Sequence, residues 1–109
     1  MNRVFKALSD PTRRRVLELL RGGPLSAGDL AEHFDVSKPT MSAHFSVLQE
    51  ADLIEAERNG RTILYRLKLS VLEDALLGFA QAVGVVGAAR RRARARPSNT
   101  LRRTLRGAT

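Results

Sequence analysis

The sequence predicts a mainly α-helical domain that carries one two-stranded β-hairpin. Three observations support this fold class. Apolar residues recur with helical spacing over most of residues 2–51 and again from about Ser70. Asn59-Gly60 separates two runs in which apolar and polar residues alternate, the pattern of a hairpin. The two-residue connection "DV" joins two of the predicted helices, as in a helix-turn-helix.

Two short helices are expected at the start of the chain. Residues 2–8 form the first, with Val4 and Phe5 among its inward side chains. Asp10 can cap the second helix, and Pro11 suits its first turn because an N–H there would have no partner. The second helix continues through "TRRRVLELL" and ends at the Gly-Gly pair that follows.

A third helix is expected in "SAGDLAEHF", and a fourth follows it over residues 37–51. Ser26 and Asp29 have the spacing of a capping box at the start of the third helix. Ser37 is a good N-cap for the fourth helix, and Pro39 lies in its first turn. The short connection between the two helices makes them the predicted helix-turn-helix.

The fourth helix has two contrasting sides. Met41, Phe45 and Leu48 fall on one side, which we expect to face the core. The opposite side carries small side chains, and the major groove of DNA accepts a helix whose outer face is free of long or acidic groups. Lys38 at the start can reach a phosphate. The predicted DNA contacts of this helix are Ser37, Lys38, Pro39, Thr40, Ser42, Ala43 and Ser46.

The hairpin after this helix has the position of a wing. Asn59-Gly60 predicts a type I′ turn, in which both residues adopt positive φ. Arg58 and Arg61 then flank a compact tip that suits phosphate or minor-groove contact. The predicted wing contacts are Arg58, Asn59, Gly60 and Arg61.

Charge is distributed unevenly along the chain. Residues 1–89 contain eleven Lys and Arg and eleven Asp and Glu, so their formal net charge is zero. Residues 90–109 contain eight Arg and no acidic residue, so they account for the whole net charge of +8. We therefore expect a folded domain over residues 1–89 and an Arg-rich, flexible tail over residues 90–109. The tail could tether DNA without sequence preference, or it could extend the last helix and bind an acidic partner or an anionic lipid surface.

Composition also excludes several classes of function. The chain has no cysteine, which excludes disulfides and thiolate metal sites. No segment reaches the roughly 18 uninterrupted apolar residues of a membrane span, and no signal peptide is expected at the N-terminus. We find no nucleophile–base–acid set and no Gly-rich phosphate loop, so an enzyme is not predicted. No cofactor and no metal are predicted either.

Three quoted segments together resemble one known family. "ALSDPTRRRVLELL", "SAGDLAEHFDVSKPTMSAHFSVLQEADLI" and "RNGRTILYRL" occur in the order found in the ArsR family of winged-helix repressors, and "VFKALSDPTRR" is most similar to its SdpR-type autorepressors. The resemblance implies that residues 37–51 are the recognition helix, that the operator is two-fold and that an inducing signal causes release. It also implies a homodimer paired through the first and last helices. The predicted dimer interface is Val4, Phe5, Leu76, Phe79, Val83 and Val86.

The predicted function is thus a sequence-specific DNA-binding transcriptional regulator, a homodimeric repressor or autorepressor without metal sensing. Its expected partners are double-stranded DNA, a second copy of itself and an inducer that is either a protein or a small ligand. It is expected in the cytoplasm of a prokaryote, on the nucleoid. The alternative is a winged-helix protein-interaction adaptor, in which only the Arg-rich tail binds nucleic acid, non-specifically.

Several residues permit two interpretations. His44 lies beside the apolar stripe of its helix, so a hydrogen-bonded structural role competes with base reading or metal binding. Arg13, Arg14 and Arg15 lie near a helix start, where cations are unfavourable, and either a solvated face or phosphate contact would account for them. The last helix is either a frayed end or a helix packed against its copy.

Overall fold

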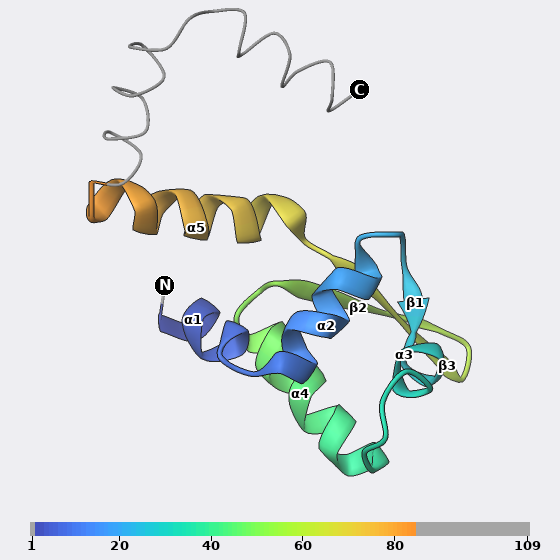
Figure 1. Cartoon of the computed structure of the whole chain (residues 1–109). Coiled ribbons are helices and arrows are strands. Elements are labelled where there is room, and N and C mark those ends of the chain that lie inside the picture. The colour runs from blue at the N-terminus through green and yellow to red at the C-terminus, as the bar shows by residue number, and fades with distance from the viewer. Residues whose placement is uncertain (1, 85–109) are drawn as a thin grey trace, which may run out of the picture. The chain divides into compact units, whose positions relative to one another are not determined.

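Residues 2–84 are described by the computed structural model, and they form five helices and three strands (Figure 1). The predicted fold class, a mainly α-helical winged helix-turn-helix, is confirmed. The elements in chain order are α1 (Asn2–Leu8), α2 (Pro11–Leu20), β1 (Leu25–Ser26), α3 (Ala27–Ala31), α4 (Lys38–Glu50), β2 (Ile54–Asn59), β3 (Thr62–Leu67) and α5 (Leu69–Ala82).

The chain divides into two compact units, one ending at Ala75 and the other beginning at Leu76, so the boundary falls within α5. The predicted boundary between residues 89 and 90 lies outside the described residues, as does the Arg-rich tail. Within residues 2–84, no helix combines the length and the apolar character needed to cross a membrane.

Side chains cap the starts of three helices, as the sequence predicts. The backbone N–H of Arg13 donates to Asp10 Oδ2 at 3.1 Å, and that of Asp29 donates to Ser26 Oγ at 3.0 Å. The N–H of Thr40 donates to Ser37 Oγ at 3.3 Å. Each bond satisfies one of the N–H groups that a helix start leaves without an intrahelical partner.

The end of α4 is a Schellman motif built without glycine. The N–H of Leu53 donates to the carbonyl of Leu48 at 3.0 Å, and that of Asp52 donates to Gln49 at 2.9 Å. Asp52 adopts a positive φ of 61°. Its carboxylate also pairs with Lys68 Nζ at 2.6 Å, which joins the end of α4 to the start of α5. The motif turns the chain sharply from α4 into β2.

The three strands form one antiparallel sheet in the order β1-β3-β2. The short strand β1 pairs Leu25 with Tyr65, and it was not predicted. Two residues give no alternation to detect, so only the tertiary pairing with β3 defines this strand.

The hairpin turn differs from the predicted one by one residue. Asn59 pairs with Thr62, so the two-residue loop is Gly60-Arg61 rather than Asn59-Gly60. Only Gly60 has a positive φ, 67°, and a positive φ at the first loop position alone is the pattern of a type II′ turn. The predicted type I′ turn is therefore wrong. Arg61 lies in the turn itself, and Arg58 lies in β2 opposite Ile63.

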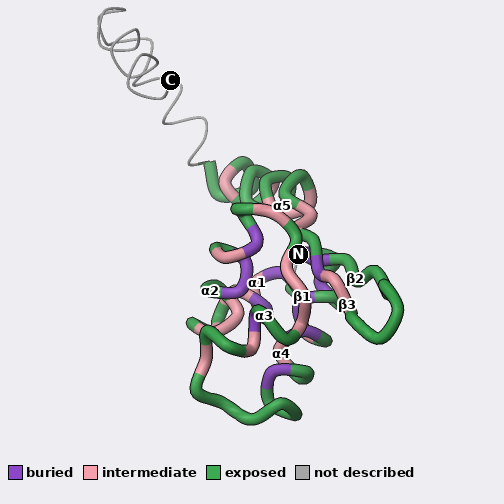
Figure 2. Tube along the Cα trace, turned by 90° about the vertical axis from the view of Figure 1, so that its right-hand side faces the viewer, coloured by how far each residue is buried: buried purple, intermediate pink, exposed green. Residues whose placement is uncertain are grey.

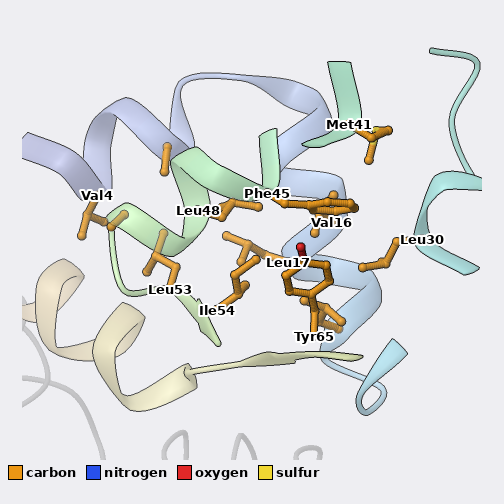
Figure 3. Close-up of a cluster of buried hydrophobic side chains, with 13 residues drawn as sticks. Val4, Val16, Leu17, Leu30, Met41, Phe45, Leu48, Leu53, Ile54 and Tyr65 are labelled. Carbon is orange, nitrogen blue, oxygen red and sulfur yellow. The ribbon is translucent and has the colours of Figure 1, made fainter. Parts of the chain in front are cut away.

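One hydrophobic core lies among α1, α2, α3, α4 and the sheet (Figure 3). At its centre the rings of Phe45 and Tyr65 are 4.6 Å apart and inclined by 34°, which ties α4 to β3. Burial raises the pKa of the Tyr65 hydroxyl above its ordinary value. The buried residues are Val4, Ala7, Val16, Leu17, Leu20, Leu30, Met41, Phe45, Leu48, Ala51, Leu53, Ile54 and Tyr65.

Candidate nucleic-acid interface

The two sides of α4 differ as the sequence predicts. Met41, Phe45 and Leu48 are buried. The residues predicted to contact DNA are all exposed, and Figure 2 shows the exposed stretch that leads into α4. They are Ser37, Lys38, Pro39, Thr40, Ser42, Ala43 and Ser46. Among them only Lys38 carries a charge, so a polyanion can approach this surface without meeting a carboxylate.

The first turn of α4 is ordered by its own hydroxyl groups. Ser37 Oγ and Thr40 Oγ1 share a hydrogen bond of 2.9 Å in addition to the capping bond. Within residues 2–84, Lys38 forms no ion pair. Its ammonium group therefore remains available to an anion at the positive end of the helix dipole.

The hairpin of β2 and β3 projects from the helices, and its tip is exposed (Figure 2). Arg58 and Arg61 are both exposed at this tip. Further from the tip, Glu57 pairs with Arg66 across the strands, with 3.3 Å between Oε2 and Nη2. This pair offsets the charge of one carboxylate on β2, so the end of the wing presents positive charge.

The three arginines at the start of α2 have specific intramolecular partners. Arg13 donates from Nε to the carbonyl of Ala7 at 2.8 Å, and Arg14 donates from Nη1 to that of Leu8 at 2.7 Å. These are carbonyls at the end of α1, where cations are favourable. Arg15 pairs with Glu18 at 2.8 Å. The predicted alternatives were a solvated face or phosphate contact, and sequence reasoning missed this use of Arg13 and Arg14.

His44 belongs to a small polar cluster beside the core. Its Nδ1 lies 3.1 Å from Arg13 Nη1 and 3.9 Å from Asp10 Oδ2. The side chain of His44 is 16% exposed. Burial opposes the charge on Asp10, but the N–H of Arg13 and the positive charges nearby outweigh it and hold the pKa of this carboxyl below its ordinary value. The structural role of His44 is therefore the one that its contacts support.

The residues predicted to form a dimer interface have different environments. Val4 is 6% exposed and belongs to the core, while Phe5 is half-buried. Leu76, Phe79 and Val83 are 45%, 41% and 57% exposed. Val86 lies outside the described residues.

Metal ligands do not gather in the part of the chain that the structure describes. No three His, Asp or Glu side chains there are placed to hold one ion. His33 is exposed in the turn after α3, and Nδ1 of His44 accepts from Arg13.

Comparison with known proteins identifies the family. Residues 8–57 match the family model described as a helix-turn-helix domain. The chain is 53% identical over 76 residues to the transcriptional repressor SdpR of Bacillus subtilis, an alignment that covers 70% of this chain and 84% of that protein. It is 40% identical over 73 residues to the arsenical resistance operon repressor of Staphylococcus xylosus, an alignment that covers 67% of this chain and 70% of that protein.

Solved structures agree with these relatives. The crystal structure of an ArsR family transcriptional regulator superposes with a TM-score of 0.71 and 29% identity, covering 79% of this chain and 94% of that one. The matched residues 8–57 include all of α4 together with α2, β1, α3 and most of β2. Taken together, the fold and the relatives show that the chain belongs to the ArsR family and is a DNA-binding transcriptional repressor.

Proposed function

We propose that this repressor binds a two-fold operator as a homodimer, with α4 of each copy in the major groove. The observation that carries the proposal is the exposed side of α4, where Pro39, Ser42, Ala43 and Ser46 lie opposite three buried core residues. The exposed start of the helix adds Ser37, Lys38 and Thr40. Core packing fixes the buried side of such a helix, and its exposed side can approach the base edges in the groove. The proposed contacts from each α4 are Ser37, Lys38, Pro39, Thr40, Ser42, Ala43 and Ser46.

The wing adds contacts beside the groove. Arg58 and Arg61 at the exposed tip would neutralise phosphates or enter the minor groove, while the backbone of Asn59 and Gly60 lets the tip come close. Such contacts add affinity for every sequence, whereas α4 discriminates among them.

The homodimer would bury apolar side chains that are exposed in a single copy. Leu76 and Val83 are the most exposed of the proposed interface residues, and Phe79 is 41% exposed. Two copies related by a two-fold axis would place their α4 helices about 34 Å apart, which is one turn of DNA. The proposed regulation is autorepression on the nucleoid of a prokaryotic cell, because the segment "VFKALSDPTRR" resembles the SdpR-type autorepressors.

An operator footprint tests this proposal. Operators are first selected from random DNA and from the DNA upstream of the gene, and hydroxyl-radical cleavage then maps the protected site. We expect symmetric protection over two half-sites. If the protein protects no symmetric site, and its DNA binding varies with salt but not with sequence, the proposal is refuted and the adaptor is favoured.

Substitution of Ser46 tests the groove assignment. Ser46→Glu places a carboxylate on the exposed side of α4, facing phosphates, so operator binding should be lost. Ser46→Ala is the matched control and should keep binding within a few-fold. Thermal unfolding should differ little among the three proteins, because Ser46 is exposed. Wild-type affinity in Ser46→Glu would refute the assignment.

The inducing signal is proposed to be something other than a metal ion bound by this chain. The chain has no cysteine, and no ligand cluster occurs among residues 2–84. Zn²⁺, Ni²⁺, Cu⁺ and arsenite at stoichiometric levels should therefore leave the operator complex intact in a fluorescence anisotropy titration. Stoichiometric release by any of them would overturn this part of the proposal.

A further inference from the structure

The guanidinium group of Arg13 joins three helices. Its Nε donates to Ala7 at 2.8 Å, and its Nη2 donates to Lys6 at 2.9 Å, so two of its bonds hold carbonyls at the end of α1. Its Nη1 lies 3.1 Å from Nδ1 of His44, on α4. Arg13 itself belongs to α2. The planar guanidinium group carries donors on three separate nitrogens and reaches these three acceptors at once, whereas the three donors of a lysine share one nitrogen.

The contact with His44 determines the state of the imidazole. Arginine has only donors, so Nδ1 of His44 must accept this hydrogen bond. The proton of the neutral ring is then on Nε2. A protonated ring carries hydrogen on both nitrogens and has no acceptor to offer.

We propose that Arg13 is a positioning residue for operator binding: through Nδ1 of His44 it holds the recognition helix α4 against the end of α1, and it does so only while His44 is neutral. The inference rests on the proposed function, because operator affinity is the property that the junction controls. His44 lies between the exposed Ala43 and the buried Phe45, so its hydrogen bond to Arg13 fixes α4 next to the residues proposed to enter the groove.

Protonation of His44 would change its partner. A charged imidazole repels Arg13, and its Nδ1–H would turn to Asp10 Oδ2, which at 3.9 Å is too distant for a hydrogen bond unless the ring moves. Within residues 2–84, the charged groups beside His44 Nδ1 are those of Arg13 and Asp10. Lys6 and Ala7 of α1 enter the cluster through backbone carbonyls, and β2 forms no ion pair with His44. The movement would shift α4 relative to α1.

The experiment measures operator affinity at pH 7.5 and pH 5.5, at one salt concentration, by fluorescence anisotropy. Histidine is the side chain that ordinarily changes charge in this range, and the chain has two of them. Wild-type protein should bind about three- to tenfold more weakly at pH 5.5, which is the order of the net contribution of one hydrogen bond. His33→Asn, the matched control, should show the same decrease, because His33 is exposed and outside the junction.

Two further variants separate positioning from general structure. His44→Asn places an amide oxygen close to the position of Nδ1, so it can accept from Arg13 and cannot titrate. It should bind like the wild type at pH 7.5 and lose the dependence on pH. Arg13→Lys should bind more weakly than the wild type already at pH 7.5, with circular dichroism confirming that it is folded.

The outcomes are distinct. The inference is overturned if wild-type affinity is the same at both pH values, or if His44→Asn keeps the wild-type decrease. Arg13→Lys with wild-type affinity at pH 7.5 would also overturn it. Absence of a symmetric footprint for the wild type at either pH would instead be a failure of the proposed function.

Discussion

Replacement of Phe45 by alanine should remove a large part of the free energy of unfolding of this domain. Phe45 is 4% exposed, and its ring lies 4.6 Å from that of Tyr65. Truncation of a buried phenylalanine to alanine costs about 3–5 kcal/mol, which includes about 0.5–1.5 kcal/mol for the ring pair. A small domain has about 5–15 kcal/mol in total, so the variant should remain only marginally folded.

Urea unfolding followed by circular dichroism measures this change. With an m value of about 1–1.5 kcal/mol per molar urea, the midpoint should fall by about 2–5 M. All proteins are compared at one concentration, because any dimer makes the apparent stability depend on it. The neighbouring exposed residue provides the control: Ser46→Ala should change the free energy of unfolding by less than about 0.5 kcal/mol.

A second readout is specific to this contact. The chain has one tyrosine and no tryptophan, so absorbance at alkaline pH reports Tyr65 alone. Burial raises the pKa of Tyr65, and loss of the Phe45 ring would expose it and return its pKa toward 10. A cost below about 1 kcal/mol together with an unchanged Tyr65 titration would refute the assignment of Phe45 to the core.

Three other predictions follow from different parts of the chain. Asp10→Ala should cost about 1 kcal/mol of the free energy of unfolding at pH 7 through loss of the N-cap. Because the pKa of Asp10 is lowered in the folded state, this stabilisation is lost as pH falls below about 3.8, and the urea midpoints of variant and wild type should converge there. Equal midpoints already at pH 7 would show that the carboxylate does not stabilise the helix. Leu76→Asp should give monomers in analytical ultracentrifugation and weaken operator binding, and an intact dimer would place the interface elsewhere. Deletion of residues 90–109 should weaken binding to every DNA and flatten the salt dependence while leaving the ranking of operators unchanged; an unaltered slope would favour an acidic protein or lipid partner for the tail.

Local patterns in the sequence predict much of this fold. The caps Asp10, Ser26 and Ser37 are recognisable because a capping side chain bonds to a backbone group only three residues away. The two sides of α4 are predictable for a similar reason, since helical spacing alone separates Phe45 from Ser46. The exposed face of α4 therefore follows from the sequence before any tertiary contact is known.

Features that depend on tertiary contacts were missed or mispredicted. Strand β1 exists only because Leu25 meets Tyr65, forty residues later in the chain. The turn at Gly60 is displaced by one residue because strand register, set by pairing along β2 and β3, decides which residues form the loop. The contacts of Arg13 with α1 and with His44 have no periodic signal in the sequence, because they depend on how three helices pack together.

A chemical cleavage experiment tests the central claim, that the exposed side of α4 lies in the major groove, most directly. Because the chain has no cysteine, Glu50→Cys introduces a single thiol that can carry an iron chelate one turn beyond Ser46, on the same side of α4 and at its exposed end. Glu18→Cys on the exposed side of α2 provides the control. With the chelate at position 50, we predict two clusters of DNA cleavage, one in each half-site of an operator whose half-sites are about 10 base pairs apart. The chelate at position 18 should leave the operator uncut. Cleavage from position 18 but not from position 50, in complexes shown to be bound, would contradict the account.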